Sequence, residues 1–328
     1  MKLWPLLLLP LTAQAATTIV FDTDCGYFGD DGAALTMVLR SPDNVRISAI
    51  TAVSGNVWAA ETAGYLGEIL HLLGRAEWKP YIGAQMPLIH SVDMAKLEGA
   101  LEFEGAFSNP LQLAPPVRPS ALDAIAAAIK HSPGRITILA LGPMTNVAML
   151  IRLYPDLETK IQRIVFMGGN VHVGGNASHA AEFNFWFDPE AAQIVLRSRI
   201  PEKVMFPLDI CNRAVLDKAR FDEIVAAGTP LTARYKEDYG MRYPGFLKDP
   251  HATGYLWDEL AAAWLLDTGF VTRQESDWLD IDTRFGKTYG ATVPLDRKLA
   301  PSATPVRVML DLDYPRLWSL YKRLLTAR

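Results

Sequence analysis

Cysteine is scarce in this chain of 328 residues, and the chain has neither a cluster of basic residues nor a low-complexity linker. Its two cysteines, Cys25 and Cys211, exclude the framework of several disulfides that stabilises many small secreted domains. One bond between them and two unpaired thiols both remain open. The formal net charge is -4, and the lysines and arginines form no basic run, which argues against a nucleic-acid partner. Since no repeat, charge block or low-complexity linker divides the sequence, we expect one large domain.

Long apolar runs are also missing, apart from one at the N-terminus. Lys2 precedes the apolar stretch Leu3–Leu11, and Ala13-Gln14-Ala15 follows it. This order is typical of a cleavable secretory signal peptide, and the stretch is too short to cross a membrane as a helix. We expect cleavage after Ala15, a mature domain over residues 16–328, and a periplasmic or secreted protein without membrane contact. A buried N-terminal strand or helix is the alternative.

Short β-rich runs alternate with helical stretches from Thr17 onward. This alternation predicts an α/β fold with a mostly parallel central sheet and helices on both faces. The expected strands are Thr18–Phe21, Val45–Val53, Ile136–Leu141, Arg163–Met167, Lys203–Pro207 and Val306–Asp311, with a hairpin over Lys287–Val293. The expected helices are Gly32–Arg40, Ala59–Leu73, Ala121–Lys130, Asn146–Arg152, Pro189–Ser198, Val215–Ala227, Asp258–Leu265 and Pro315–Leu325.

Polar motifs follow several of the expected strands. Open α/β sheets bind ligands outside the carboxyl ends of their strands. We therefore expect these motifs to converge on one site, although they are far apart in the sequence. They are Asp22-Thr23-Asp24, Ser54-Gly55-Asn56, Gly142–Asn146, Gly168-Gly169-Asn170 and Leu208-Asp209.

Four carboxylates, Asp22, Asp24, Asp30 and Asp31, lie within ten residues of the first expected strand end. Hard divalent cations prefer such oxygen ligands, and carboxylates this close repel one another without a positive partner. The spacing fits neither an EF-hand nor a zinc site of histidine and cysteine. Calcium or magnesium is therefore expected. Capping of the following helix by Asp30 or Asp31 is the alternative.

The acidic segment resembles the inosine-uridine preferring nucleoside hydrolases, whose signature is an Asp-x-Asp, a glycine and an Asp-Asp pair. The resemblance extends over nearly all of the mature chain, and the ordered set of motifs makes it specific. It implies the Rossmann-like nucleoside hydrolase fold, with the active site at the C-terminal strand ends. The similar segments are Asp22–Asp31, Ser54-Gly55-Asn56, Tyr81–Ala84, Pro87-Leu88, Leu141–Asn146, Phe166–Gly169, Gly175-Asn176, Ala181–Asn184, Asp188–Ala192 and Trp257-Asp258.

This resemblance implies a calcium-dependent hydrolysis of the N-glycosidic bond of ribonucleosides, which gives ribose and a free nucleobase. The Ca²⁺ ligands would be Asp24, Asp31, Asp258 and the backbone carbonyl of Thr145, with Asp24 also the general base for a calcium-bound water. Family members commonly form dimers or tetramers, so a homodimer and a homotetramer are both open. The substrate would contact Asp30, Asn56, Met167, Asn176, Glu182, Asn184, Trp257 and Asp258.

The expected residue types suit this chemistry. Hydrolysis of a glycosidic bond passes through an oxocarbenium-like sugar, and anionic groups around the ribose favour that cation over the neutral substrate. Each residue also has a structural alternative. The asparagines could be turn residues, Glu182 a surface charge, Met167 part of the core and Asp258 a helix cap.

Two departures from the family pattern concern the first loop and the leaving group. Gly26–Gly29 makes the loop before Asp30 longer than the common form. Trp257 stands where well-studied members have a histidine that protonates the departing base, and an indole can stack on a base but cannot act as an acid. Tyr239, Tyr243 and His251 are the candidate substitutes, and the preferred nucleobase stays open.

Two other functions compete with nucleoside hydrolysis. A phosphatase of the haloacid dehalogenase type also begins with a strand and an Asp-x-Asp, but it explains only Asp22–Asp24. A non-catalytic periplasmic protein that binds ribose or nucleosides would suit the signal peptide and the missing histidine.

Overall fold

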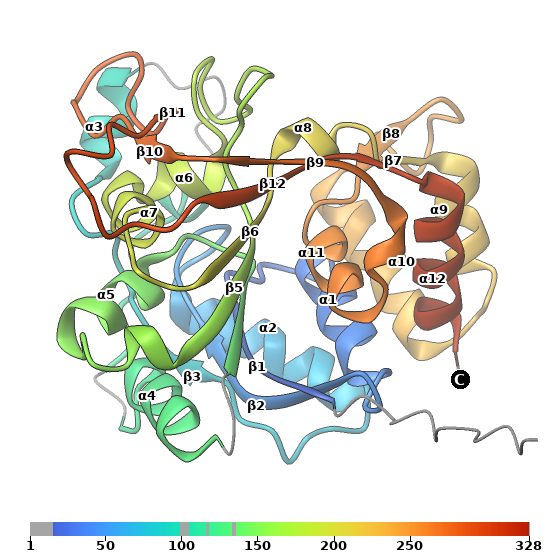
Figure 1. Cartoon of the computed structure of the whole chain (residues 1–328). Coiled ribbons are helices and arrows are strands. Elements are labelled where there is room, and N and C mark those ends of the chain that lie inside the picture. The colour runs from blue at the N-terminus through green and yellow to red at the C-terminus, as the bar shows by residue number, and fades with distance from the viewer. Residues whose placement is uncertain (1–15, 99–104, 116–117, 133–135, 328) are drawn as a thin grey trace, which may run out of the picture.

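The structure is a computed structural model that describes residues 16–98, 105–115, 118–132 and 136–327 (Figure 1). The predicted signal peptide lies outside these residues. Their helices are α1 (Asp30–Leu39), α2 (Ala59–Leu72), α3 (Val92–Glu98), α4 (Ala121–His131), α5 (Thr145–Leu153), α6 (Phe183–Phe187), α7 (Pro189–Leu196), α8 (Leu208–Cys211), α9 (Lys218–Val225), α10 (Pro230–Arg242), α11 (Asp258–Leu266) and α12 (Tyr314–Thr326). Their strands are β1 (Thr17–Thr23), β2 (Val45–Ala52), β3 (Tyr81–Ile82), β4 (Ile136–Ala140), β5 (Ile161–Met167), β6 (Glu202–Phe206), β7 (Val215–Asp217), β8 (Thr253–Tyr255), β9 (Val271–Asp277), β10 (Leu279–Ile281), β11 (Thr292–Pro294) and β12 (Val306–Leu312).

An eight-stranded sheet forms the centre of the molecule, in the order β3-β2-β1-β4-β5-β6-β12-β9. Every neighbouring pair is parallel except β12 and β9, which are antiparallel. The sheet confirms the predicted α/β fold with a mostly parallel sheet. No helix of the described residues is long and apolar enough to cross a membrane.

Helices cover both faces of the sheet, because alternate residues of its strands point to opposite sides. In β1, Ile19 and Phe21 pack into the core beneath α1, α2 and α9–α12, whereas Val20 packs into the core beneath α4, α5 and α7. Figure 1 shows these two groups of helices on opposite sides of the strands. Near-continuous apolar strands are expected for a sheet that is buried on both faces.

The chain changes direction across the sheet between β1 and β4. It adds β2 and β3 on one side of β1, then returns to place β4 on the other side. Such a switch point opens a crevice at the carboxyl ends of the two central strands. Asp24 follows β1 there, and Gly142 follows β4, so the topology brings the first acidic motif and the Leu141–Asn146 motif together.

Several expected elements differ in the structure. The expected helix Val215–Ala227 is split, because Val215–Asp217 pairs with Thr253–Tyr255 as a strand and the helix begins at Lys218. Asp217 caps that helix by accepting a hydrogen bond from the Arg220 N–H at 2.8 Å. A hairpin was expected over Lys287–Val293, but the paired strands are β10 and β11. Most of the expected segment is the connection between them, where Gly290 has φ +82°.

The sequence patterns missed α10 and β9 altogether. Helix α10 carries many polar residues, and β9 runs along the sheet edge with a largely exposed surface. Cys25 and Cys211 are both buried and unbonded, so the structure answers the open question of their pairing.

Candidate active site

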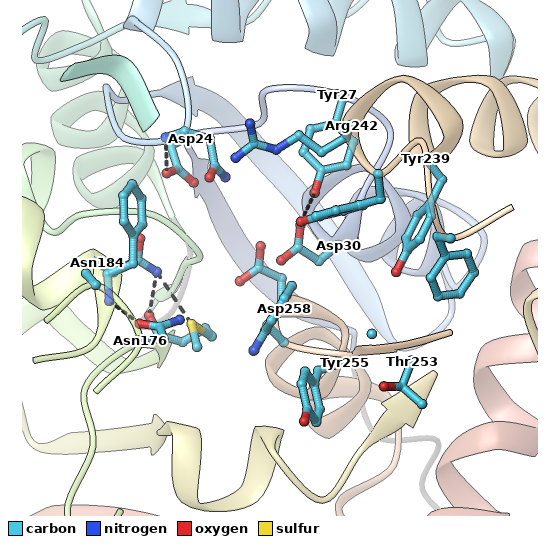
Figure 2. A pocket seen from close by; sticks show the side chains of 18 of the residues that line it. Asp24, Tyr27, Asp30, Asn176, Asn184, Tyr239, Arg242, Thr253, Tyr255 and Asp258 are labelled. Atoms are coloured by element: carbon cyan, nitrogen blue, oxygen red, sulfur yellow. Dashed lines mark hydrogen bonds between the residues drawn. The ribbon is translucent and has the colours of Figure 1, made fainter. Parts of the chain in front are cut away.

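A cavity of about 860 Å³ opens at the carboxyl ends of the central strands (Figure 2). It collects predicted residues from widely separated parts of the chain, as convergence at one sheet edge requires. The predicted residues that line it are Asp24, Asp30, Asn56, Met167, Asn176, Glu182, Asn184, Trp257 and Asp258.

Asp24 lines the cavity, and backbone groups from distant parts of the chain hold its side chain in place. Its Oδ2 accepts a hydrogen bond from the Asn56 N–H at 2.7 Å. Two glycines press against its carboxylate: a Cβ added at Gly55 would lie 2.0 Å from Oδ2, and one added at Gly142 would lie 2.8 Å from Oδ1. These contacts explain the glycines of the Ser54-Gly55-Asn56 and Leu141–Asn146 motifs, since a side chain at either position would displace Asp24.

Asp30, Asp31 and Asp258 bring their carboxylates together beside Asp24. One oxygen from each of the three lies within 4.8 Å of the others. Asp30 and Asp31 begin α1, and Asp258 begins α11, so the helices fix the geometry. The geometry groups Asp30 with Asp31 and Asp258, whereas the family resemblance assigns Asp24 as the third carboxylate ligand.

Asp24, Asp31 and Asp258 are buried and Asp30 is half-buried, which makes their negative charges costly. Burial, followed by the charge of Asp30, raises the pKa of Asp31 to about 8. Burial and the charge of Asp31 raise the pKa of Asp24 and Asp258 well above the usual range. A bound dication would offset this repulsion, and several carboxylate oxygens in one buried place are the donors that Ca²⁺ and Mg²⁺ prefer. The residues therefore fit a hard divalent cation.

Helix capping does not account for these aspartates. Gly29 holds the N-cap position of α1 and Trp257 that of α11, and neither helix has a side-chain cap hydrogen bond. Asp31 instead accepts hydrogen bonds from the Thr23 hydroxyl and, at 3.4 Å, from the Asn56 side chain.

Asp22 does not join the cluster. Strand β1 runs two residues further than expected, so Asp22 lies inside the sheet, where it accepts hydrogen bonds from Thr51 (2.5 Å) and Asn146 (2.7 Å). Burial raises its pKa to about 6. Its role is structural, because it joins β1 to β2 and to the start of α5.

The opposite wall of the cavity is built around Glu182. This side chain is buried rather than at the surface, and it caps α6 by accepting from the N–H groups of Asn184 (2.9 Å) and Phe185 (3.1 Å). Asn184 donates to the backbone carbonyls of Leu141 (3.1 Å) and Met167 (3.2 Å). These contacts hold the side chains of this wall in place before any ligand binds.

Some expected residues lie outside the cavity lining. Thr145 begins α5, and its hydroxyl donates to Asp188 at 2.6 Å; a contact from its carbonyl to a cation stays a prediction. Asp209 accepts from the N–H groups of Val171 and His172 (2.9 and 2.7 Å), and Asn170 donates to backbone carbonyls. These last two motifs shape the loops around the site rather than its surface.

Aromatic residues also line the cavity. Trp257 lies there with Tyr239 and Tyr243, two of the three candidate acids, whereas His251 is exposed and outside the lining. The motifs did not identify Tyr27, Arg242 or Tyr255 as site residues. Tyr27 belongs to the longer first loop, and the departure of that loop from the family pattern was the advance signal for it. No signal in the sequence pointed to Arg242 in α10 or to Tyr255 in β8.

Comparison with known proteins relates the chain to one family. A family model described as inosine-uridine preferring nucleoside hydrolase matches residues 19–319. The pyrimidine-specific ribonucleoside hydrolase RihA of Salmonella enteritidis PT4 is 34% identical over 303 residues, which cover 91% of this chain and 94% of that protein. RihA of Citrobacter koseri is 34% identical over 301 residues, with the same coverage.

Solved structures show the same fold. An inosine-guanosine nucleoside hydrolase superposes with a TM-score of 0.79 at 23% identity, over 95% of this chain and 99% of that one. The purine-preferring ribonucleoside hydrolase from Gardnerella vaginalis gives a TM-score of 0.74 at 24% identity, over 94% and 98% of the two chains.

The metal-free chain should lose stability as the pH rises. Burial raises the pKa of Asp22 to about 6, of Glu182 to about 7 and of Asp31 to about 8. Unfolded carboxyls titrate near about pH 4, so the folded state holds more protons from about pH 4 to about pH 8 and the free energy of unfolding falls across that window. The urea midpoint of the chelated protein should be lower at about pH 8 than at about pH 5. Asp31→Asn should reduce this difference between the two midpoints. Equal midpoints at the two pH values in the unsubstituted chain would contradict the prediction.

Proposed function

This chain belongs to the inosine-uridine preferring nucleoside hydrolase family and is a nucleoside ribohydrolase; we propose that it works with Ca²⁺ and with Asp24 as its general base. The observation that carries the proposal is the close group of carboxylates from Asp30, Asp31 and Asp258, two of them buried, at a cavity that Asp24, Asp30 and Asp258 line. Family membership decides against the phosphatase, and it favours an enzyme over a protein that only binds nucleosides.

Ca²⁺ would be held by Asp31 and Asp258, with Asp24 or Asp30 as the third carboxylate and the Thr145 carbonyl as a further oxygen. When bound, it would orient a water molecule and lower the pKa of that water. Asp24 would accept the proton; in support, its carboxylate lines the cavity and is held by the Asn56 N–H at 2.7 Å.

The rest of the cavity would bind the ribose and favour its positive charge. Asn56, Asn176 and Asn184 supply amides, and Asp30 and Glu182 supply carboxyl groups, all from the lining. Positive charge that develops on the ring in the transition state is stabilised by such fixed anionic and dipolar groups. Since the RihA relatives are described as pyrimidine-specific, we propose uridine as the first substrate to test.

Ribose release from nucleosides should depend on the cation. Residues 16–328 should release ribose from uridine, and a chelator should abolish the release until Ca²⁺ is restored, because the buried carboxylates repel one another without a dication. The assay compares uridine, inosine, 4-nitrophenyl riboside and 4-nitrophenyl phosphate. Activity that survives chelation would contradict the calcium proposal, and phosphate release alone would favour the phosphatase.

Replacing Asp24 should remove both functions proposed for it. Asp24→Ala should lower kcat for uridine by about 10³-fold or more, because the proton acceptor is lost, and should weaken Ca²⁺ binding in a calorimetric titration. Asp43→Ala, a change at an exposed aspartate outside the cavity, is the matched control. An Asp24→Ala enzyme with normal turnover would show that another group is the base.

Export of the chain is proposed from the order of charge, apolar stretch and small residues in its first 15 residues. When the full sequence is expressed in a bacterium, the exported protein should begin at Ala16, which N-terminal sequencing of the periplasmic and secreted fractions measures. An intact N-terminus on protein confined to the cytoplasm would contradict the proposal.

A further inference from the structure

Arg242 gives the cavity a positive charge. Among the described residues that line the cavity, it is the only cationic side chain. It is the last residue of α10, and its guanidinium extends toward the side of the cavity where Asp24 lies (Figure 2). Its charge opposes the rise in the pKa of both Asp30 and Tyr27. The carboxylates that share the lining are Asp24, Asp30, Glu182, Asp249 and Asp258.

The longer first loop holds the end of α10 in place. The Phe28 N–H donates to Asp238 Oδ2 at 2.8 Å, and the Phe28 ring contacts Tyr235 edge-on with centroids 5.5 Å apart. The Tyr27 and Tyr243 hydroxyls lie 3.4 Å apart. Since the same loop leads directly into Asp30 at the start of α1, it holds the end of α10, which carries Arg242, close to the acidic cluster.

Three of the groups considered as acids for the departing base are poorly suited to that role. An indole cannot donate a proton to it, so Trp257 is excluded, and His251 does not line the cavity. Burial, and then the charge of Tyr243, raises the pKa of Tyr239, which makes its hydroxyl a weaker acid. A guanidinium differs from all of these groups, because it keeps its charge at any working pH.

We propose that Arg242 binds the carbonyl oxygen of the departing nucleobase and stabilises the base as an anion, so that no acid is needed; this inference rests on the proposed function. The bond between C1′ and the base nitrogen breaks, and its electron pair stays with the base. The oxygen of water bonds to C1′, and its proton passes to Asp24. The anionic base takes a proton from solvent after release.

The chemistry of the guanidinium selects the kind of base. In uracil the electron pair on the glycosidic nitrogen is delocalised onto the neighbouring carbonyl oxygen, which becomes the better acceptor as the bond breaks. A charged donor aimed at that oxygen therefore stabilises the transition state more than the ground state. A guanidinium has five N–H donors, so it can bind the oxygen and keep its contacts with the protein.

Leaving groups that differ in basicity test this role. Arg242→Met should lower kcat for uridine by about 100-fold, which is the effect of removing one donor from an oxyanion site. The same change should alter kcat for 4-nitrophenyl riboside by less than about threefold, because nitrophenolate leaves readily without help. Arg242→Lys should recover part of the uridine activity by restoring charge without the planar fork. Arg75→Met, at an exposed ion pair with Glu77, is the matched control.

The outcomes separate the inference from the function on which it rests. A selective loss with uridine supports the role of Arg242. Equal losses with both substrates, or no loss with either, overturn it while nucleoside hydrolysis stands. An unsubstituted enzyme that hydrolyses neither substrate overturns both. Arg242→Gln, which keeps much of the side-chain length, gives a second comparison if the methionine variant does not fold.

Discussion

The site depends on repulsion among buried carboxylates at the switch point of a parallel sheet. Asp24, Asp31 and Asp258 come from two regions more than 200 residues apart in the chain, and burial raises the pKa of all three. A fold that only needed stability would not gather them, since burying charge without a partner is costly. The cost becomes useful when a dication offsets it, because the same field then favours positive charge on a bound ribose.

The surrounding scaffold keeps this arrangement rigid. Gly55 and Gly142 leave space for the Asp24 carboxylate, while Asn146 and Thr51 fix Asp22 in the sheet below it. On the outer side, Asp238 of α10 holds the first loop through the Phe28 N–H. The cavity is thus lined on one side by residues that follow the central strands, and on another by residues of α10 and of the longer first loop.

The sequence predicted the parts of the molecule that depend on local pattern. The central strands are short apolar runs followed by polar motifs, so both the sheet and the convergence of Asp24 and Asn56 could be expected, whereas Asn184 was expected only from the family resemblance. Contacts set by tertiary structure were not predictable. Asp22 and Asp209, like Asp24, are aspartates in polar motifs that follow expected strands. In the structure, however, Asp22 lies inside the sheet and Asp209 holds a loop. Arg242 ends a polar helix that apolar periodicity could not identify, and Val215–Asp217 is a strand because Thr253–Tyr255 pairs with it.

The central claim is that a dication lies among these carboxylates, and diffraction can test it directly. Crystals of residues 16–328 grown with Ca²⁺ should show one anomalous-scattering peak between Asp31 and Asp258, with Asp24 or Asp30 completing the carboxylate ligands. The position of the peak would also decide between those two aspartates. A cavity without such a peak, in crystals of protein that still cleaves nucleosides, would contradict the account.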